Sequence, residues 1–201
     1  MFTIFYWIYI FGGIVLTLSL NLIFHFSMQT VLDFFIIFVL ILIPSIISLL
    51  FEKILPNSFF DGHLAFYKPK KFEKNLYKKL RVKDWKDYVP NFGNVGKDLS
   101  KDQQPSIELF EKFLHQTCLG EVVHKFCVAS SVVVSLIILI VRTDLFLRMA
   151  LPICFVYVTI NILSIIIQRY NRPRLYVMIE RLKRTQQQPD TNAEESKEQV
   201  A

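Results

Sequence analysis

Long apolar runs alternate with charged segments along this chain. Four runs stand out, at about residues 2–25, 34–51, 126–141 and 147–168. A helix needs about 20 predominantly apolar residues to cross the hydrocarbon core of a bilayer. The first and last runs reach this length alone, and the middle two reach it with interfacial residues at their ends. The pattern predicts an all-α integral membrane protein with four transmembrane helices.

The first run could instead be a signal peptide. Its opening residues, MFTIFYW, carry no positive charge, and no small-residue cleavage site follows, whereas a signal peptide has both features. We therefore interpret it as an uncleaved span, which forms a hairpin with the second run through a connection at 27–33.

The segment 56–121 between the second and third runs is basic and has a helical periodicity of its own. Phe72, Leu76 and Leu80 recur every four residues with lysines between them, which is typical of an amphipathic helix on an anionic membrane surface. A second helix is expected to begin near Ser106, a residue type that caps helix N-termini, and to continue into the third span.

The last run leads into QRYNRPR and then into a further amphipathic pattern. Pro173 suits the first turn of a helix, and apolar residues repeat at helical spacing from Leu175 onward. We expect an interfacial helix at 173–184. The final residues, 185–201, are polar and are predicted to be disordered, which leaves 1–184 as a single membrane domain.

The chain is basic, with a net charge of +6, and the charge is unevenly placed. No Lys or Arg precedes Lys53, twelve lie within 56–121, and seven lie from Arg169 onward. Because Lys and Arg are retained on the cytoplasmic side, both termini and the long loop are predicted to be cytoplasmic. A basic loop beside four spans indicates contact with the lipid bilayer and not with nucleic acid.

Polar residues follow one face of each of the last two predicted spans. One antiparallel register joins them into a polar seam, with the pairs Ser135–Tyr157, Ser131–Asn161 and His124–Gln168. This seam would open at the cytoplasmic side beside Arg169. Small and polar residues are also common where membrane helices pack, so packing alone is the alternative explanation for the serines.

Glu121 and His124 are ionisable residues at the edge of a span, where such side chains suggest function. At a spacing of three residues on a helix, the carboxylate can accept a hydrogen bond from one ring nitrogen. The other nitrogen is then free to accept a proton, as a general base for a hydroxyl does. The alternative is an interfacial pair that only marks the start of the span.

A zinc site is a rival interpretation of the same segment, because His115, Cys118, His124 and Cys127 are zinc-ligand types. On a continuous helix the two histidines are separated by about 900° of rotation about the helix axis. The pair His115 and Cys118 therefore points in the opposite direction to the pair His124 and Cys127. Zinc binding would need a sharp break at Gly120, and we expect no metal. Cys127 as a nucleophile is disfavoured, because an apolar span suppresses thiolate formation.

Three segments together resemble a known family. They are IIIQRYNRPRL followed by IERLKR, NLYKKLRVKDWKDYVP at 75–90, and the E-x-x-H of Glu121 and His124. Their order and spacing are similar to those of the glycosyl-4,4'-diaponeurosporenoate acyltransferases, small bacterial membrane proteins of carotenoid pigment synthesis. The resemblance covers about 75–184. It implies a multi-pass protein of the bacterial cell (inner) membrane that transfers a fatty acyl chain to a sugar hydroxyl of a glycosylated carotenoid, or of a related glycolipid.

The residues themselves suggest how such a transfer would proceed. His124, positioned by Glu121, would take the proton of the attacking hydroxyl, and Gln168 or Arg169 would stabilise the oxyanion. The acyl donor would be a thioester, acyl-CoA or acyl carrier protein, with no cofactor. Guanidinium groups bind phosphate through paired hydrogen bonds, which suggests three ligands for the donor's phosphates: Arg169, Arg172 and Arg174.

Other predicted substrate contacts are Asn171, which would orient the acceptor, the seam residue Asn161, and Trp85 and Lys86, which would cover the site from the loop. The alternative to an enzyme is a small membrane scaffold or assembly protein that binds anionic lipid or a partner through its basic loop. A transporter is disfavoured, because no inverted repeat and no charged residue at the midplane of a span is present.

Overall fold

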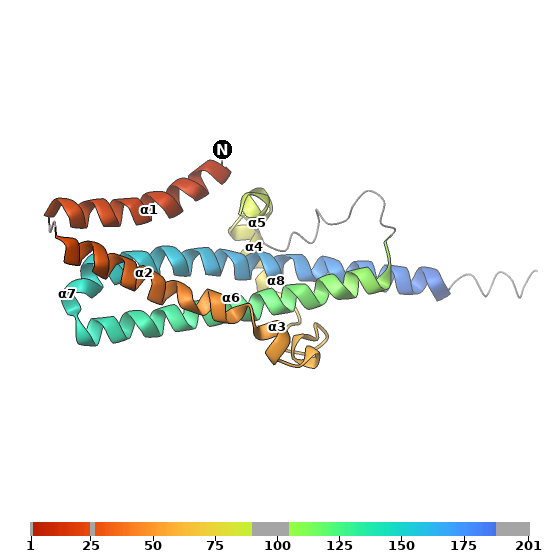
Figure 1. The fold of residues 1–201 in the computed structure, drawn as a ribbon. Coiled ribbons are helices and arrows are strands. Elements are labelled where there is room, and N and C mark those ends of the chain that lie inside the picture. Colours follow the sequence, from red (N-terminus) through yellow and green to blue (C-terminus); the bar gives the residue numbers. More distant parts are fainter. Residues whose placement is uncertain (1, 25–26, 90–104, 188–201) are drawn as a thin grey trace, which may run out of the picture.

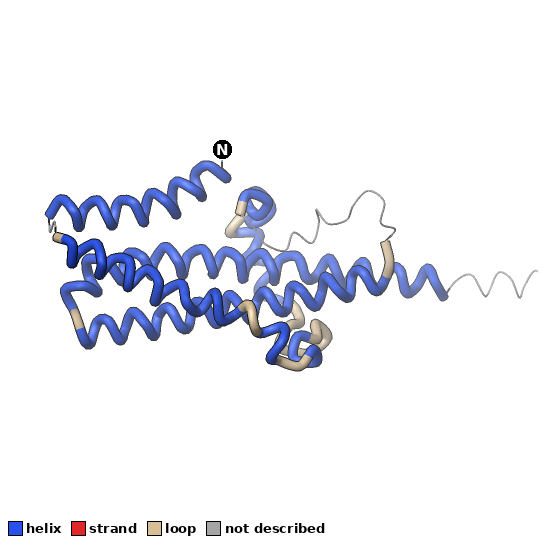
Figure 2. Tube along the Cα trace, in the orientation of Figure 1, coloured by secondary structure: helices blue, strands red, loops and turns tan. Residues whose placement is uncertain are grey.

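The computed structural model describes residues 2–24, 27–89 and 105–187, and all regular structure among them is helical, without a strand (Figure 1, Figure 2). The all-α class is therefore confirmed. Two long helices, α6 (Ile107–Val141) and α8 (Leu151–Gln187), run antiparallel along the length of the molecule (Figure 1). This pair is the frame on which every other described element rests.

Three helical stretches are long and apolar enough to cross a membrane: Met28–Ile54, Ile107–Val141 and Thr143–Gln186. The first helix, α1 (Phe2–Phe24), is also apolar. Its apolar stretch, Ile10–Phe24, is shorter than the other three. Large apolar side chains remain exposed along these helices, as expected for surfaces that face lipid instead of water. Three spans are thus supported, and the fourth stays a prediction.

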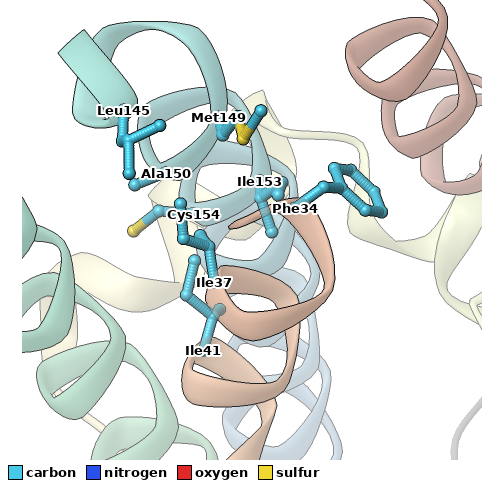
Figure 3. Packing of buried hydrophobic residues seen from close by; sticks show 8 residues of the cluster. All are labelled: Phe34, Ile37, Ile41, Leu145, Met149, Ala150, Ile153 and Cys154. Carbon is cyan, nitrogen blue, oxygen red and sulfur yellow. The ribbon is translucent and has the colours of Figure 1, made fainter. Parts of the chain in front are cut away.

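One apolar core holds the spanning helices together at the end of the molecule away from the loop. It is built where α2 (Met28–Ser48) and the start of α8 meet the short turn formed by α7 (Thr143–Leu145) and η3 (Phe146–Ala150). Figure 3 shows its residues, which are Phe34, Ile37, Ile41, Leu145, Met149, Ala150, Ile153 and Cys154. Helix α1 joins this end through Asn21, whose side-chain amide donates to the Arg148 carbonyl at 3.1 Å.

The predicted connection between the first two apolar runs, at 27–33, is wrong over most of its length, because α2 already begins at Met28. Ser27 caps this helix: its Oγ accepts a hydrogen bond from the Thr30 amide at 3.0 Å. Such a cap satisfies one of the free donors of the first turn, so the helix begins earlier than apolar content alone suggests.

The helix predicted to begin near Ser106 is present, and it is the same helix as the third apolar run. Ser106 is its N-cap, and its Oγ accepts from the Leu109 amide at 3.1 Å. The predicted tail begins at 185, but α8 continues to Gln187, and residues 188–201 lie outside the described part of the chain.

The separate interfacial helix predicted at 173–184 is wrong, because α8 passes through Pro173 without ending. A proline inside a helix removes one backbone hydrogen bond and usually kinks or breaks the helix. Here the turns beyond it are held by burial: Leu175 and Ile179 pack against apolar residues at the start of α6. Tertiary packing outweighs the local signal, and the arginines around Pro173 therefore lie on one continuous helix.

The segment between α2 and α6 packs on the α6–α8 pair from two sides (Figure 1). On one side lie α3 (Phe51–Ile54) and η1 (Asn57–Phe60). On the other side lie α4 (Lys71–Lys79) and α5 (Val82–Trp85), which is followed by a short 3-10 turn. The expected amphipathic pattern is visible in α4, whose apolar residues Phe72 and Leu76 are exposed.

Gly62 is where this segment approaches α6 most closely. A Cβ atom at this position would lie 2.3 Å from Cγ of Leu114, a side chain that is 1% exposed. The Gly62 carbonyl also accepts a hydrogen bond from the Tyr176 hydroxyl. Gly62→Ala should destabilise the protein by about 1–3 kcal/mol through overpacking, seen as a lower unfolding temperature in detergent. Ala65→Ser, at an exposed position of the same loop, is the control, and equal unfolding temperatures for both variants would contradict this packing.

Candidate active site

A cluster of buried ion pairs joins α4, α6 and α8. Its centre is the Glu121 carboxylate, which is completely buried. One carboxylate oxygen lies 2.8 Å from Nη1 of Arg169 and also contacts the Lys125 ammonium. The other oxygen lies 2.8 Å from Nη2 of Arg172. A buried charge is tolerated when opposite charges and hydrogen bonds surround it. Three cations surround Glu121, and one of its two oxygens accepts the hydrogen bonds.

Arg172 is 1% exposed, and all its contacts are internal. Its guanidinium donates to the Tyr67 carbonyl at 2.8 Å, and to the hydroxyl and the carbonyl of Thr117 at 3.2 and 3.1 Å. It also lies over the Tyr67 ring, 5.2 Å from the centroid. These donors join the loop to α6 and α8, and the predicted contact of Arg172 with the donor's phosphates stays a prediction.

The guanidinium of Arg169 likewise forms ion pairs with carboxylates. Its Nη2 lies 2.6 Å from Oε1 of Glu73 on α4, in addition to its contact with Glu121. Glu73 in turn accepts a hydrogen bond from the Tyr77 hydroxyl at 3.1 Å. Burial, and then the neighbouring Glu73, raise the pKa of Tyr77 to about 12, so Tyr77 remains a donor at neutral pH. A phosphate at Arg169 would have to displace a carboxylate, and the phosphate role predicted for this residue stays a prediction.

His124 makes its hydrogen bond to Asn161 of α8 and not to Glu121. Its Nδ1 lies 2.8 Å from Oδ1 of Asn161, while the amide nitrogen of Asn161 donates to the Tyr157 carbonyl at 2.9 Å. That second bond fixes the orientation of the amide, so Oδ1 must accept a proton held on Nδ1. In the neutral ring Nε2 then carries the free lone pair. The predicted Glu121–His124 contact is wrong, and Asn161 positions the histidine.

The predicted seam register is also wrong, by one to two helical turns. His124 was expected beside Gln168 but pairs with Asn161, and Gln168 lies beside Gly120 instead. A Cβ atom at Gly120 would be 3.0 Å from Nε2 of Gln168, so the glycine permits this close approach of the two helices. The other seam residues also find different partners, in the pairs Cys154–Ser131 and Tyr157–Ser45.

A groove of about 920 Å³ lies beside the ion cluster, between α4, α5 and the second half of α8. Two tyrosines, Tyr77 and Tyr170, line it with their ring centroids 5.8 Å apart. Arg174 lies over Tyr170, 5.0 Å from the ring centroid, and donates to its hydroxyl at 3.0 Å. Six further cations line the groove: Lys70, Lys71, Lys74, Lys78, Arg81 and Lys83. Of the three arginines predicted to bind phosphate, only Arg174 faces this open space.

A model of the family described as glycosyl-4,4'-diaponeurosporenoate acyltransferase matches residues 63–181. The match covers more than half of the chain, and it includes the ion cluster, the His124–Asn161 pair and the groove. The chain belongs to the glycosyl-4,4'-diaponeurosporenoate acyltransferase family. No curated protein and no solved structure matches it.

In this member of the acyltransferase family, the QRYNRPR segment divides between two faces of α8. Arg169 and Arg172 point into the ion cluster, while Tyr170, Pro173 and Arg174 line the groove. Spacings of three and four residues on a helix produce this division. The family segment therefore both fastens the loop to the helices and forms one wall of an open basic surface.

The remaining predicted site residues have local or no partners within the described part of the chain. Trp85 donates through its ring nitrogen to the Leu80 carbonyl at 2.9 Å, and Lys86 pairs with its neighbour Asp87. Asn171 is half-buried on α8, and its side chain has no hydrogen bond to the described residues. Contacts of these residues with substrate stay predictions.

Several residues of this site were missed from the sequence, among them Glu73, Tyr67, Thr117 and Lys125. The acidic Glu73 within a lysine-rich helix was the one visible signal, because an acid among the lysines of a basic amphipathic helix needs an explanation. Nothing in the sequence marks Tyr67 or Thr117, since they act mainly through backbone carbonyls.

The zinc interpretation fails on the geometry of α6, which is unbroken through Gly120. Its two histidine–cysteine pairs therefore lie on opposite sides of the helix. Among the described residues, no group of three or more His, Cys, Asp or Glu side chains is arranged to hold a metal ion.

Proposed function

We propose that this protein transfers a fatty acyl chain from a thioester donor to a sugar hydroxyl of a glycosylated carotenoid or a related glycolipid. The observation that carries this proposal is that the acyltransferase family match spans His124 and Asn161, a pair in which the histidine keeps one nitrogen free to accept a proton. The apolar helices agree with a membrane-dissolved acceptor. The Lys and Arg distribution supports a site at the cytoplasmic face of the bacterial membrane.

The reaction begins when His124 Nε2 takes the proton of the sugar hydroxyl. The hydroxyl oxygen attacks the thioester carbonyl and forms a C–O bond, which gives a tetrahedral oxyanion. When this intermediate collapses, the C–S bond breaks, and the proton on His124 passes to the departing thiolate. The products are the acyl ester and the free thiol, and the histidine is restored. Asn161 keeps Nδ1 protonated throughout, so Nε2 remains the reactive nitrogen.

Gln168 is the better of the two predicted oxyanion donors. Both of the carboxylates that flank Arg169 hold its guanidinium in place. The side-chain amide of Gln168 has no hydrogen-bond partner among the described residues and lies against Gly120, one helical turn from His124. An amide donor aimed at the developing charge stabilises the intermediate in a site that excludes water.

Mass spectrometry of lipid extracts tests the proposed reaction in cells. Expression in a bacterium that makes glycosylated carotenoids should produce a new species whose mass equals acceptor plus fatty acid minus water. The empty vector is the control. An unchanged lipid and pigment profile at normal membrane levels of the protein would contradict acyl transfer and favour the scaffold alternative.

A further inference from the structure

We infer that the basic groove between α4, α5 and α8 binds the nucleotide phosphates of the acyl donor, so that the donor is a nucleotide thioester of the coenzyme A type. This inference rests on the proposed acyl transfer, and it assigns the donor a site that differs from the predicted arginine set. The assignment follows from the charge of the groove, its aromatic lining, its orientation and its distance from His124 along α8.

Positive charge is concentrated in the groove, and acidic side chains do not neutralise most of it. Seven Lys and Arg side chains line it against one acid, Asp84, and that acid pairs with Arg81 at 2.7 Å. The five lysines of the groove have no ion-pair partner among the described residues. Like charges gathered in one hollow repel each other and create a strong positive potential. A ligand with several phosphate groups would relieve this repulsion, whereas a ligand with one negative charge would leave most of it.

The shape and aromatic lining of the groove suit a nucleotide. Its volume of about 920 Å³ is within the range of sites for small-molecule ligands and cofactors. The rings of Tyr77 and Tyr170 make a T-shaped contact, and Arg174 lies over the Tyr170 ring and donates to its hydroxyl. Aromatic rings and guanidinium planes are the groups on which nucleobases stack. An acidic carrier protein would instead need a broad surface of about 800 Å² on each partner.

The orientation of α4 argues against a lipid headgroup as the ligand. Within α4, the groove lysines Lys74 and Lys78 each lie two positions from an apolar residue on either side, and residues two apart point about 200° away from each other on a helix. The apolar residues are Phe72, Leu76 and Leu80, and each is more than 40% exposed. If this apolar stripe enters the membrane surface, the lysines face away from the bilayer, where a soluble ligand from the cytoplasm can reach them.

The groove and the proposed base lie along one helix. Tyr170 of the groove and Asn161 beside His124 are nine residues apart on α8, which corresponds to about 13–14 Å along the axis and about 900° of rotation, so the two side chains lie on opposite sides of the helix. A donor bound here by its phosphates must therefore carry its thioester at the end of a long arm. A nucleotide joined to its thiol by an extended linker meets this requirement.

Binding of free coenzyme A to the purified, detergent-solubilised protein tests this inference. The groove variant replaces Lys70, Lys74 and Lys78 by Gln, and the control variant replaces three exposed lysines outside the groove. These are Lys53, Lys79 and Lys112. We expect the groove variant to bind coenzyme A at least about tenfold more weakly than the wild type, and the control to bind normally. Unchanged binding in the groove variant would overturn the inference.

Two further arms separate the alternative ligands. Acyl carrier protein and vesicles of anionic phospholipid are compared with coenzyme A at matched salt concentrations, and a groove-dependent preference for either one would also overturn the inference. Because binding is measured without turnover, the two proposals fail separately. Groove-dependent binding without ester formation would contradict the proposed function alone. Ester formation with an unchanged KM for acyl coenzyme A in the groove variant would contradict the groove assignment alone.

Discussion

Arg172→Ala should remove most of the folded protein from the membrane. The substitution takes one cation from the buried Glu121 carboxylate, and it leaves carbonyls of Tyr67 and Thr117 without their donor. Removing one partner of a buried ion pair costs about 3–5 kcal/mol, against a total stability of about 5–15 kcal/mol. The measurement is the yield of monodisperse protein after detergent extraction, together with its unfolding temperature.

The control for this effect lies two residues further along the same helix. Arg174→Ala removes the same charge from an exposed position, so the yield and the unfolding temperature should stay close to those of the wild type. Arg172→Lys keeps the charge but cannot make all of the guanidinium bonds, and it should fall between the two. Equal stability of the alanine variants at 172 and 174 would contradict a structural role for the ion cluster.

His124→Gln should lower the rate of acyl transfer by about 10²–10⁴-fold, which is the usual contribution of a general base. Glutamine keeps the polarity and approximate size of the histidine but cannot take up the proton. The protein should remain folded, because His124 lies outside the ion cluster. The measurement is the initial rate of ester formation at matched amounts of protein. Ser131→Ala is a suitable control, since among the described residues the Ser131 hydroxyl bonds to the carbonyl of Val128 in its own helix.

Asn161→Ala tests whether the Asn161 amide positions His124 or only contributes to the packing of the two helices. Without the amide, Nδ1 of His124 loses the acceptor that holds its proton, and both tautomers become populated. We expect a lower kcat with an unchanged KM for the donor, and a shifted pH–rate profile. A loss of protein with an unchanged profile in what remains would assign Asn161 to packing. A wild-type rate in the His124→Gln variant would contradict the base assignment itself.

The sequence was sufficient for those features that depend on neighbouring residues. The long apolar runs and the periodicity of α4 are local patterns, and both correspond to helices in the structure. The cap at Ser106 is also local, and it marks the start of α6. The family motifs are also contiguous, and the family resemblance is confirmed by the match over 63–181.

Features that depend on how the helices meet could not be derived in this way. The register of α6 against α8 is set by close approach at Gly120, and the apolar pattern alone permits several registers. Helix α8 continues through Pro173 because its later turns pack against α6. The proline by itself favours a break in the helix at this position. Glu73 meets Arg169 across 96 positions of sequence. As a result, two arginines that looked suitable for phosphate belong to the interior, and the lysines of α4 provide the open basic surface.

The most direct test of the account is a stopped-time assay of the purified protein in lipid vesicles, with an acyl thioester and a glycosylated carotenoid as the two substrates. Free thiol and acyl ester are measured in the same sample. We expect the two products to form in equal amounts with the wild type and both to disappear with His124→Gln. Thiol release without ester, or ester formation that persists in the His124 variant, would contradict acyl transfer by this site.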